Sequence, residues 1–310
     1  MSFPMILSLG QTALELALFN SLTVLALFLS YSMLNVCDLS TDGCFALGAA
    51  VGAVVAIAGH PWLSIPAAMG AGMLSGFVTA TLQTRMGVNS LLAGIIVNTG
   101  LYSVNIAIMG GSSLLNMNKT VTVFSMLKAA LKGTALDGLS ALLIGLIAAG
   151  AVIAFLSLFL RTKLGLAIRA TGDNPDMVRS SSINPVFTTT VGLCISNSFT
   201  ALSGCLLAQS QKSTTVDIGS GMVTVALASL LIGGVFLGRR RIPLRAVGAV
   251  LGAFVFRLVY TIALRFNLPA FMLKLVSSVI VVIAISGPYL KSRLPEMKRR
   301  LSARGGRAVG

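Results

Sequence analysis

The sequence predicts an all-α fold, a polytopic transmembrane helical bundle with about nine spans. Hydrophobic residues make up 55% of the 310-residue chain and charged residues only 10%, so the apolar surface is too large to be hidden in one water-soluble core. Apolar runs of roughly 17 to 25 residues recur between polar breaks, and such lengths match a hydrocarbon layer about 30 Å thick. Because a backbone in lipid must satisfy its own polar groups, these runs are expected to form helices.

The expected spans belong to one membrane domain over residues 1–290. Its halves cover about 1–138 and 139–290, and a basic tail follows at 291–310. The second span is short. If 36–59 is instead a re-entrant hairpin, the N-terminus changes sides and the later topology stays the same. The nine expected spans are 13–34, 45–59, 62–84, 89–109, 139–160, 186–211, 222–238, 246–265 and 273–290.

Positive charge is distributed very unevenly along the chain. The first 84 residues contain no Lys or Arg, whereas 161–185 contain four, 239–245 four and 291–310 seven. Positively charged segments beside spans stay in the cytoplasm, so these three should face inward and the N-terminus outward. The net charge of +15 does not indicate a nucleic-acid partner, because no soluble basic face with base-reading or stacking groups accompanies it.

Few side chains in the sequence are suited to catalysis. His60 is the single histidine and stands in a Gly-His-Pro-Trp turn, where an interfacial loop position explains it better than a role as general base. The four cysteines show neither CxxC spacing nor pairing with histidine, which disfavours a zinc site or a disulfide framework. A phosphate-binding GxxxxGK[ST] loop is also missing from the sequence. We therefore expect no catalytic residue, no metal site and no cofactor bound by this chain.

Two glycine-containing acidic segments indicate an internal repeat. Residues 36–43, VCDLSTDG, and residues 215–221, TVDIGSG, each precede a helix rich in small residues. The expected topology makes the two segments run in opposite directions, as in the inverted repeats of many transporters. Broken backbone is tolerated in a bilayer only where it lines a cavity or is buried in protein, which favours a translocation path. The alternative is a pair of tight turns at the membrane edge, with Asp and Ser as ordinary N-caps.

Polar side chains also occur inside the expected spans. Asn98, Tyr102 and Asn105 fall on roughly one face of the fourth span, and Asn197 belongs to a polar patch in the sixth. Such faces are costly against lipid and should point into the bundle. Hydrogen bonding between helices explains either patch without a substrate.

Arg257 lies inside the eighth expected span. An unpaired cation there costs at least about 2.5 to 3.5 kcal/mol, so Arg257 is expected to pair with Asp38, Asp42 or Asp217. The residues expected to line the translocation path are Asp38, Ser40, Asp42, Asn98, Tyr102, Asn105, Asn197, Asp217 and Arg257.

Glycine pairs with GxxxG spacing predict close helix packing, because they let two backbones approach each other in lipid. We expect these pairs to pack helices of the same chain together in preference to forming dimer contacts. The pairs are Gly48 with Gly52, Gly72 with Gly76, and Gly248 with Gly252.

Residues 161–185 are the one substantial polar island between the apolar runs 139–160 and 186–211, and they contain Gly, Asn and Pro breakers. This layout is typical of a cytoplasmic elbow that holds a short helix outside the bilayer for another protein to push on. It indicates transport. Leu164 and Ile168 give the segment an apolar stripe, and a merely solvated loop is the alternative.

Four stretches of the chain carry motifs: NVCDLSTDGCFALGAAV at 35–51, LGLAIRATGDNP at 164–175, LAQSQKSTTVDIGSGM, and the stretch from Tyr260 to Pro269. Together they resemble the matching segments of bacterial ABC-importer permeases of the branched-chain amino acid and simple-sugar superfamily. The resemblance is strongest to the smaller permeases that occur with a lipoprotein-like binding protein and are sometimes linked to aromatic amino acid uptake. Compared with the larger sugar permeases, the chain is expected to have one N-terminal span fewer before the Asp38 segment.

The resemblance implies a multi-pass permease subunit in the bacterial cytoplasmic (inner) membrane. Its implied partners are cytoplasmic ABC ATPase subunits, an extracytoplasmic solute-binding protein that delivers a small, amino-acid-like solute, a second permease copy as a homodimer, and membrane lipid. ATP and Mg²⁺ would be bound by the ATPase. The elbow is similar to the coupling helix that docks in a groove of the ATPase. Its core would be Gly165, Ala167, Ile168, Arg169, Ala170, Gly172, Asn174 and Pro175.

Two other functions compete with an ABC permease. An ion-coupled secondary transporter would act without an ATPase, driven by an ion gradient through Asp38, Asp42 or Asp217. A membrane enzyme would need acid and base groups that the sequence scarcely offers. Transport by the isolated chain in liposomes would indicate the first, and turnover by the purified chain the second.

Overall fold

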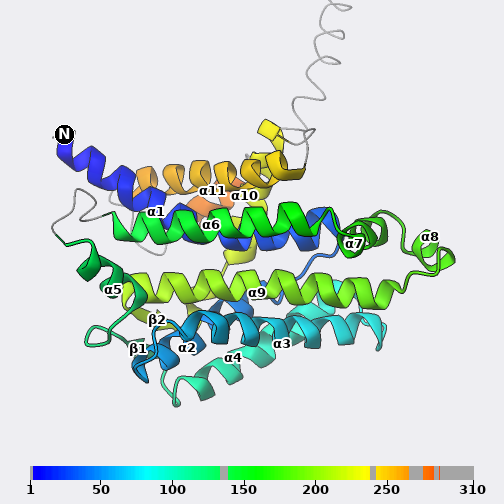
Figure 1. Ribbon diagram of the computed structural model, residues 1–310, viewed down its shortest axis with the longest axis horizontal. Helices are drawn as coiled ribbons and strands as arrows, with labels where there is room; N and C mark the ends of the chain where they lie inside the picture. The colour runs from blue at the N-terminus through cyan, green and yellow to red at the C-terminus, as the bar shows by residue number, and fades with distance from the viewer. Residues whose placement is uncertain (1–2, 133–138, 238–241, 265–274, 283–285, 287–310) are drawn as a thin grey trace, which may run out of the picture.

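A computed structural model describes residues 3–132, 139–237, 242–264, 275–282 and 286 (Figure 1). These residues form a bundle of helices with one small antiparallel sheet at its end. In chain order the elements are α1 Phe3–Leu27, the π-helix η1 Phe28–Met33, α2 Thr41–Ile57, α3 Ser64–Thr84, α4 Ser90–Ile108, β1 Leu114–Asn116, α5 Val123–Ala130, α6 Ser140–Phe159, α7 Lys163–Asp173, α8 Pro175–Ser180, α9 Pro185–Gln211, β2 Ser213–Thr215, the 3₁₀ helix η2 Val216–Gly219, α10 Met222–Leu237 and α11 Ile242–Leu264.

The helices confirm the predicted fold class, an all-α polytopic membrane protein. Within the described residues, seven helical segments are long and apolar enough to cross a membrane, and α2 is a shorter apolar helix. Together they correspond to the first eight expected spans. The ninth span, 273–290, is described only in part, and the basic tail at 291–310 lies outside the described residues. A total of nine spans therefore stays a prediction.

Helix α9 is the centre of the bundle and packs against α1, α2 and α3. The hydroxyl groups of Ser196 and Ser203 donate hydrogen bonds to the carbonyl oxygens of Ala26 and Phe19 in α1, at 2.8 and 2.7 Å. These two bonds make α1 antiparallel to α9. They also confirm that polar residues of α9 connect helices to one another, as expected for hydroxyl groups in lipid.

The glycine pairs predicted from GxxxG spacing contact other helices of the same chain. A Cβ on Gly48 in α2 would collide with the carbonyl oxygen of Ala201 in α9, and a Cβ on Gly72 in α3 would collide with that of Asn197. Gly252 packs in the same way against Ser229 of α10, and Gly248 lies close to Leu237 and Gly233. The expected packing within the chain is therefore confirmed, and it brings the helix backbones into direct contact.

The elbow and the small sheet lie at opposite ends of the bundle, which we call the elbow end and the sheet end (Figure 1). At the sheet end, β1 pairs with β2 and Leu114 lies opposite Thr215. The buried amide of Gln209 joins three elements there. Its Oε1 accepts the backbone N–H of Val123 at 3.1 Å, and its Nε2 donates to the Ser64 hydroxyl at 2.6 Å. Helices α3, α5 and α9 are thus held together at this end.

The chain breaks between η1 and α2. Leu34, at the end of η1, contacts Gly172 of the elbow, and Asn35 has a φ of 57°, a left-handed conformation that turns the chain. Asp38 then lies beside Asn197, halfway along α9. Helix α2 begins at that depth and runs to the sheet end, where it contacts β2. Residues 34–57 therefore complete a crossing, and the re-entrant alternative for 36–59 is wrong.

A second break precedes α10. The carboxylate of Asp42 accepts the backbone N–H groups of Gly221 and Val223 at 2.9 and 2.8 Å, so α10 begins at the depth where α2 begins. Helix α10 runs from there to the elbow end and packs on α11, whose Arg245 donates to the Ser32 hydroxyl of η1 at 2.8 Å. The two half-helices run in opposite directions, as the inverted repeat predicts. Turns at the membrane edge, the alternative, are wrong.

A buried polar network holds the first break in place. Asp38 is only 1% exposed. One of its oxygens accepts the backbone N–H and the hydroxyl of Ser40 at 2.8 and 2.6 Å, and the other accepts the side-chain amide of Asn197 at 2.8 Å. The Thr79 hydroxyl donates to that of Ser40 at 3.3 Å. Neutral donors from Ser40 and from α9 thus stabilise the Asp38 carboxylate inside the bundle, and α3 supports the Ser40 hydroxyl.

We predict that Gly48→Ala lowers the free energy of unfolding by about 1 to 3 kcal/mol, because the added methyl group forces α2 away from α9. Gly150→Ala is the matched control: a Cβ on that α6 glycine meets nothing within 4 Å, and alanine favours the helix. Thermal unfolding of both variants in one detergent measures the difference. Equal melting temperatures would contradict the close contact between α2 and α9.

Replacing Asn197 by alanine should also lower the free energy of unfolding, by about 1 to 3 kcal/mol, because one oxygen of buried Asp38 loses its donor. Ser198→Ala is the control, since the Ser198 hydroxyl donates to Ile195 within its own helix. Thermal unfolding again provides the measurement. The double variant Asp38→Ala, Asn197→Ala should recover part of the loss, and strictly additive effects would show that the two side chains are not coupled.

Candidate functional site

A cavity of about 410 Å³ lies where α2, α4 and η2 meet. This volume falls in the range of about 300 to 1,000 Å³ that is usual for small-molecule sites. Its walls come from the first turns of α2, from the polar face of α4 and from the segment between β2 and α10. The lining residues are Asp42, Gly43, Ala46, Asn98, Thr99, Tyr102, Ser103, Asn105, Val216, Asp217 and Ser220.

The cavity brings together residues that the sequence predicted for the path from both halves of the chain. Asp38, Ser40 and Asn197 do not line it, because they form the buried network beside α9. The predicted residues in its wall are Asp42, Asn98, Tyr102, Asn105 and Asp217.

Two amide side chains of α4 approach α2 closely at Gly43. The Asn105 Nδ2 donates to the Gly43 carbonyl oxygen at 3.2 Å, and a Cβ on Gly43 would lie only 2.7 Å from the Asn98 Oδ1. Asn105 is 1% exposed, and its Oδ1 has no hydrogen-bond partner among the described residues. The Asn105 Oδ1 is thus a buried acceptor that could accept a hydrogen bond from a ligand.

The cavity is open on the outer side of α4. Thr99, Tyr102 and Ser103 are exposed there, and the Tyr102 side chain is 51% exposed. Polar side chains at membrane depth are rarely left against lipid, and they usually face protein or a water-filled cavity. The exposed polar side chains of this face therefore favour protein or water over hydrocarbon as their environment.

Arg257 does not line this cavity, and its expected pairing with an acidic residue is wrong. The guanidinium carbon lies 5.1 Å from the ring centroid of Tyr260, on the same helix, and the Nε has no hydrogen-bond partner in the described part of the chain. The expected partners Asp38 and Asp42 accept hydrogen bonds from other groups. A cation–π contact of about 0.5 to 2 kcal/mol offsets part of the cost of burying this cation.

Helices α7 and α8 form the elbow that was predicted at 161–185. Thr162 begins α7, because its hydroxyl accepts the backbone N–H of Gly165 at 3.2 Å. Asn174 begins α8 by accepting two backbone N–H groups at 3.1 and 3.0 Å, and Pro175 occupies the first position of that helix. Both helices therefore begin at a side-chain cap.

The structure divides the predicted coupling residues into an inner and an outer set. The inner set packs on η1 and α9, and the Ile168 side chain is fully buried there. The apolar stripe of the elbow thus faces its own chain. Gly165, Ala167 and Ile168 are buried, Arg169, Ala170 and Gly172 are half-buried, and Asn174 and Pro175 are exposed.

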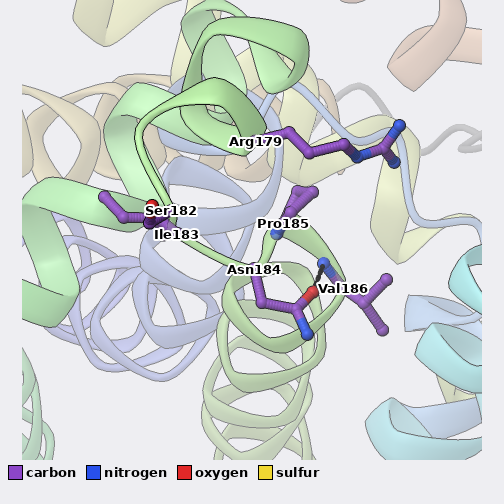
Figure 2. Close-up of a pocket in the computed structure, with 6 residues that line it drawn as sticks. All are labelled: Arg179, Ser182, Ile183, Asn184, Pro185 and Val186. Atoms are coloured by element: carbon purple, nitrogen blue, oxygen red, sulfur yellow. Dashed lines mark hydrogen bonds between the residues drawn. The ribbon is translucent and has the colours of Figure 1, made fainter.

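The surface of the elbow that is open to a partner consists largely of other residues. Leu166 and Met177 are 51% and 56% exposed. The elbow also has a shallow hollow of about 280 Å³ between α8 and the start of α9 (Figure 2). Figure 2 shows the Arg179 side chain on one side of it and Ile183 on the other. Exposed apolar side chains and a hollow lined by Arg179 are suited to docking another protein.

Sequence reasoning missed three polar residues that build this region. Ser220 lines the cavity and belongs to the glycine-containing segment before α10, so the repeat pattern could have indicated it. Thr79 and Gln209 make buried hydrogen bonds between helices. Nothing in their local sequence marks them, because only the tertiary contacts bring their partners near.

Comparisons with known proteins agree with this architecture. The family model described as branched-chain amino acid transport system / permease component matches residues 12–285. The chain is 28% identical over 286 residues to the tyrosine transport system permease protein of Clostridioides difficile (strain R20291), with 92% of this chain and 93% of that protein covered. It is 29% identical over 282 residues to an uncharacterised protein of Rickettsia prowazekii (strain Madrid E), with 89% and 96% covered. No solved structure matches significantly. Because the family model spans almost the whole membrane domain, the chain belongs to the family of permease components of branched-chain amino acid transport systems.

Proposed function

We propose that a small solute crosses the membrane through the cavity between α2, α4 and η2. The chain is a permease subunit of an ABC importer for small solutes, in keeping with its family. The observation that carries the proposal is the meeting of two half-helices at Asp42, beside the cavity. Discontinuous helices that meet near the middle of the membrane form the substrate sites of many transporters.

A cytoplasmic ABC ATPase would dock on the outer side of the elbow, at Leu166, Met177 and the hollow beside Arg179. The capped helices α7 and α8 are held against η1 and α9, so a push on the elbow moves a rigid element. ATP and Mg²⁺ belong to that partner in this proposal, and this chain supplies the surface that receives the motion.

The contact between the elbow and η1 supports a route from the ATPase to the cavity. A Cβ on Gly172 would collide with the Met33 carbonyl oxygen and lie 2.8 Å from the Leu34 carbonyl carbon. The chain then passes through Asp38 to Asp42, which lines the cavity. Displacement of α7 would therefore shift the segment that carries both acidic residues.

A second permease copy would cover the open side of the cavity, as a homodimer. The support is the polar outer face of α4, where Thr99, Tyr102 and Ser103 are exposed. Lipid suits the exposed side chains of α6 instead, since Leu146 and Ile147 are 61% and 67% exposed and apolar. The proposal thus assigns different environments to the outer faces of the two helices.

An extracytoplasmic binding protein would deliver the solute at the sheet end. That end carries β1, β2 and α5, opposite the elbow (Figure 1). An amino-acid-like solute is supported by the family description and by the relative named as a tyrosine transport system permease. Tyrosine and branched-chain amino acids are therefore the first substrates to test.

We predict that Leu166→Asp reduces ATP-dependent uptake more than about tenfold, because a charge enters the apolar surface that receives the ATPase. Uptake is measured in proteoliposomes that contain this chain, its ATPase and its binding protein. Met86→Asp is the matched control, since Met86 is 68% exposed and follows α3 at the elbow end, outside α7 and α8.

Uptake by the Leu166→Asp variant at the control rate would refute docking on this face. Uptake by the chain alone, driven by a sodium or proton gradient, would refute the dependence on an ATPase and indicate an ion-coupled transporter.

A further inference from the structure

The charged side chains that line the cavity are acidic. Among the described residues, the lining includes the carboxylates of Asp42 and Asp217 and no lysine, arginine or histidine. The other polar groups are neutral amides and hydroxyls. In a membrane, where solvation by water is limited, acidic groups that have no cation beside them favour a positively charged guest.

The two carboxylates are not equivalent. Both oxygens of Asp42 already accept backbone N–H groups at the start of α10, at 2.9 and 2.8 Å. Asp217 is exposed to the cavity, and within the described ranges its carboxylate takes part in no hydrogen bond or ion pair. Asp42 therefore serves to hold the start of α10, whereas the Asp217 carboxylate is available to bind a ligand.

A second feature points to a ligand with several hydrogen-bond donors. Asn105 belongs to the lining of the cavity and is 1% exposed, and its buried Oδ1 has no hydrogen-bond partner among the described residues. A buried acceptor of this kind is stabilised by a donor from a guest. A primary ammonium group offers three donors and a positive charge, so one group could satisfy both the carboxylate and the amide oxygen.

The aromatic ring in the wall fits the same guest. Tyr102 is half exposed in the cavity, and aromatic faces attract ammonium groups, more strongly where water is excluded. A guest whose only charged group is a carboxylate would be repelled by both acidic residues, and a neutral sugar would leave their charge unbalanced.

We propose that this cavity binds the protonated primary amine of the transported solute, with Asp217 as its counter-ion, Asn105 as an acceptor and Tyr102 as an aromatic wall. The inference rests on the proposed function for the identity of the cavity as the path. It goes further by naming the chemical group that the permease itself recognises and the residue that confers the preference.

The charge preference can be measured on the full chain in liposomes by cysteine labelling. Ser103→Cys places a thiol in the cavity wall, in a background with Cys37→Ser and Cys194→Ser; the remaining Cys44 and Cys205 are buried. Labelling rates are compared for a cationic methanethiosulfonate, bearing trimethylammonium, and an anionic one, bearing sulfonate. Each rate is divided by the rate of the same reagent with a free thiol.

We expect the corrected rates to favour the cation about tenfold, and Asp217→Asn to remove most of that preference. Asp176→Asn is the matched control, because Asp176 is an exposed carboxylate of the elbow, outside the cavity. Equal corrected rates for the two reagents, or an unchanged ratio in Asp217→Asn, would overturn the proposal.

Recognition of the amine is tested by protection from a small neutral thiol reagent. Three molecules of similar shape are compared at millimolar concentration: 2-phenylethylamine, 3-phenylpropionate and 2-phenylethanol. We expect the amine alone to slow labelling of Ser103→Cys, and its effect to disappear in Asp217→Asn. Equal protection by the acid or the alcohol, or protection by sodium chloride in place of the amine, would overturn the proposal.

The labelling experiments need no ATPase, so the two proposals can fail separately. ATP-driven uptake without amine protection would remove the ammonium site and leave the transport function. Amine protection without ATP-driven uptake would leave the site and remove the importer mechanism.

Discussion

A helix that begins in the middle of a membrane leaves its first backbone N–H groups where little water can reach them, and α10 is such a helix. Each unpaired group would cost several kcal/mol in a hydrocarbon environment. That cost is comparable with the whole free energy of unfolding of a typical protein. The Asp42 carboxylate supplies the missing acceptors from the first turn of α2. The rest of the architecture depends on this contact, because it fixes where both half-helices start and joins the two halves of the repeat.

Small side chains make that contact possible. A Cβ on Gly219 would collide with the Asp42 carbonyl oxygen, and one on Gly204 in α9 would collide with that of Phe45 in α2. The backbones of η2 and α9 therefore both touch α2 without intervening side chains. On the side of α2 that faces α4, the amides of α4 line a polar cavity. The wall of the cavity is thus built from the same segments, α2 and η2, whose backbones meet at Gly219.

Sequence reasoning predicted the spans, the repeat and the elbow because each depends on local composition. Asp42 and Asp217 could be recognised since acid and glycine recur at matching places in the two halves. The depth of the breaks was not predictable: it depends on contacts such as Asp38 with Asn197, which are 159 residues apart in the chain. Arg257 was misjudged for a related reason. The rule that buried charges pair with opposite charges did not anticipate an aromatic partner on the same helix.

The burial of the inner side of the elbow limits how motion can pass through the molecule. If α7 met a partner through its apolar stripe, it could move without disturbing the bundle. Instead Ile168 is fully buried and Gly172 lies against the backbone of η1, so any displacement of α7 must displace η1 or break packed contacts. A π-helix is less regular than an α-helix and tends to occur at functional sites. Because η1 leads directly into the segment that holds Asp38 and Asp42, the closely packed elbow and the start of α2 are joined by one short stretch of backbone.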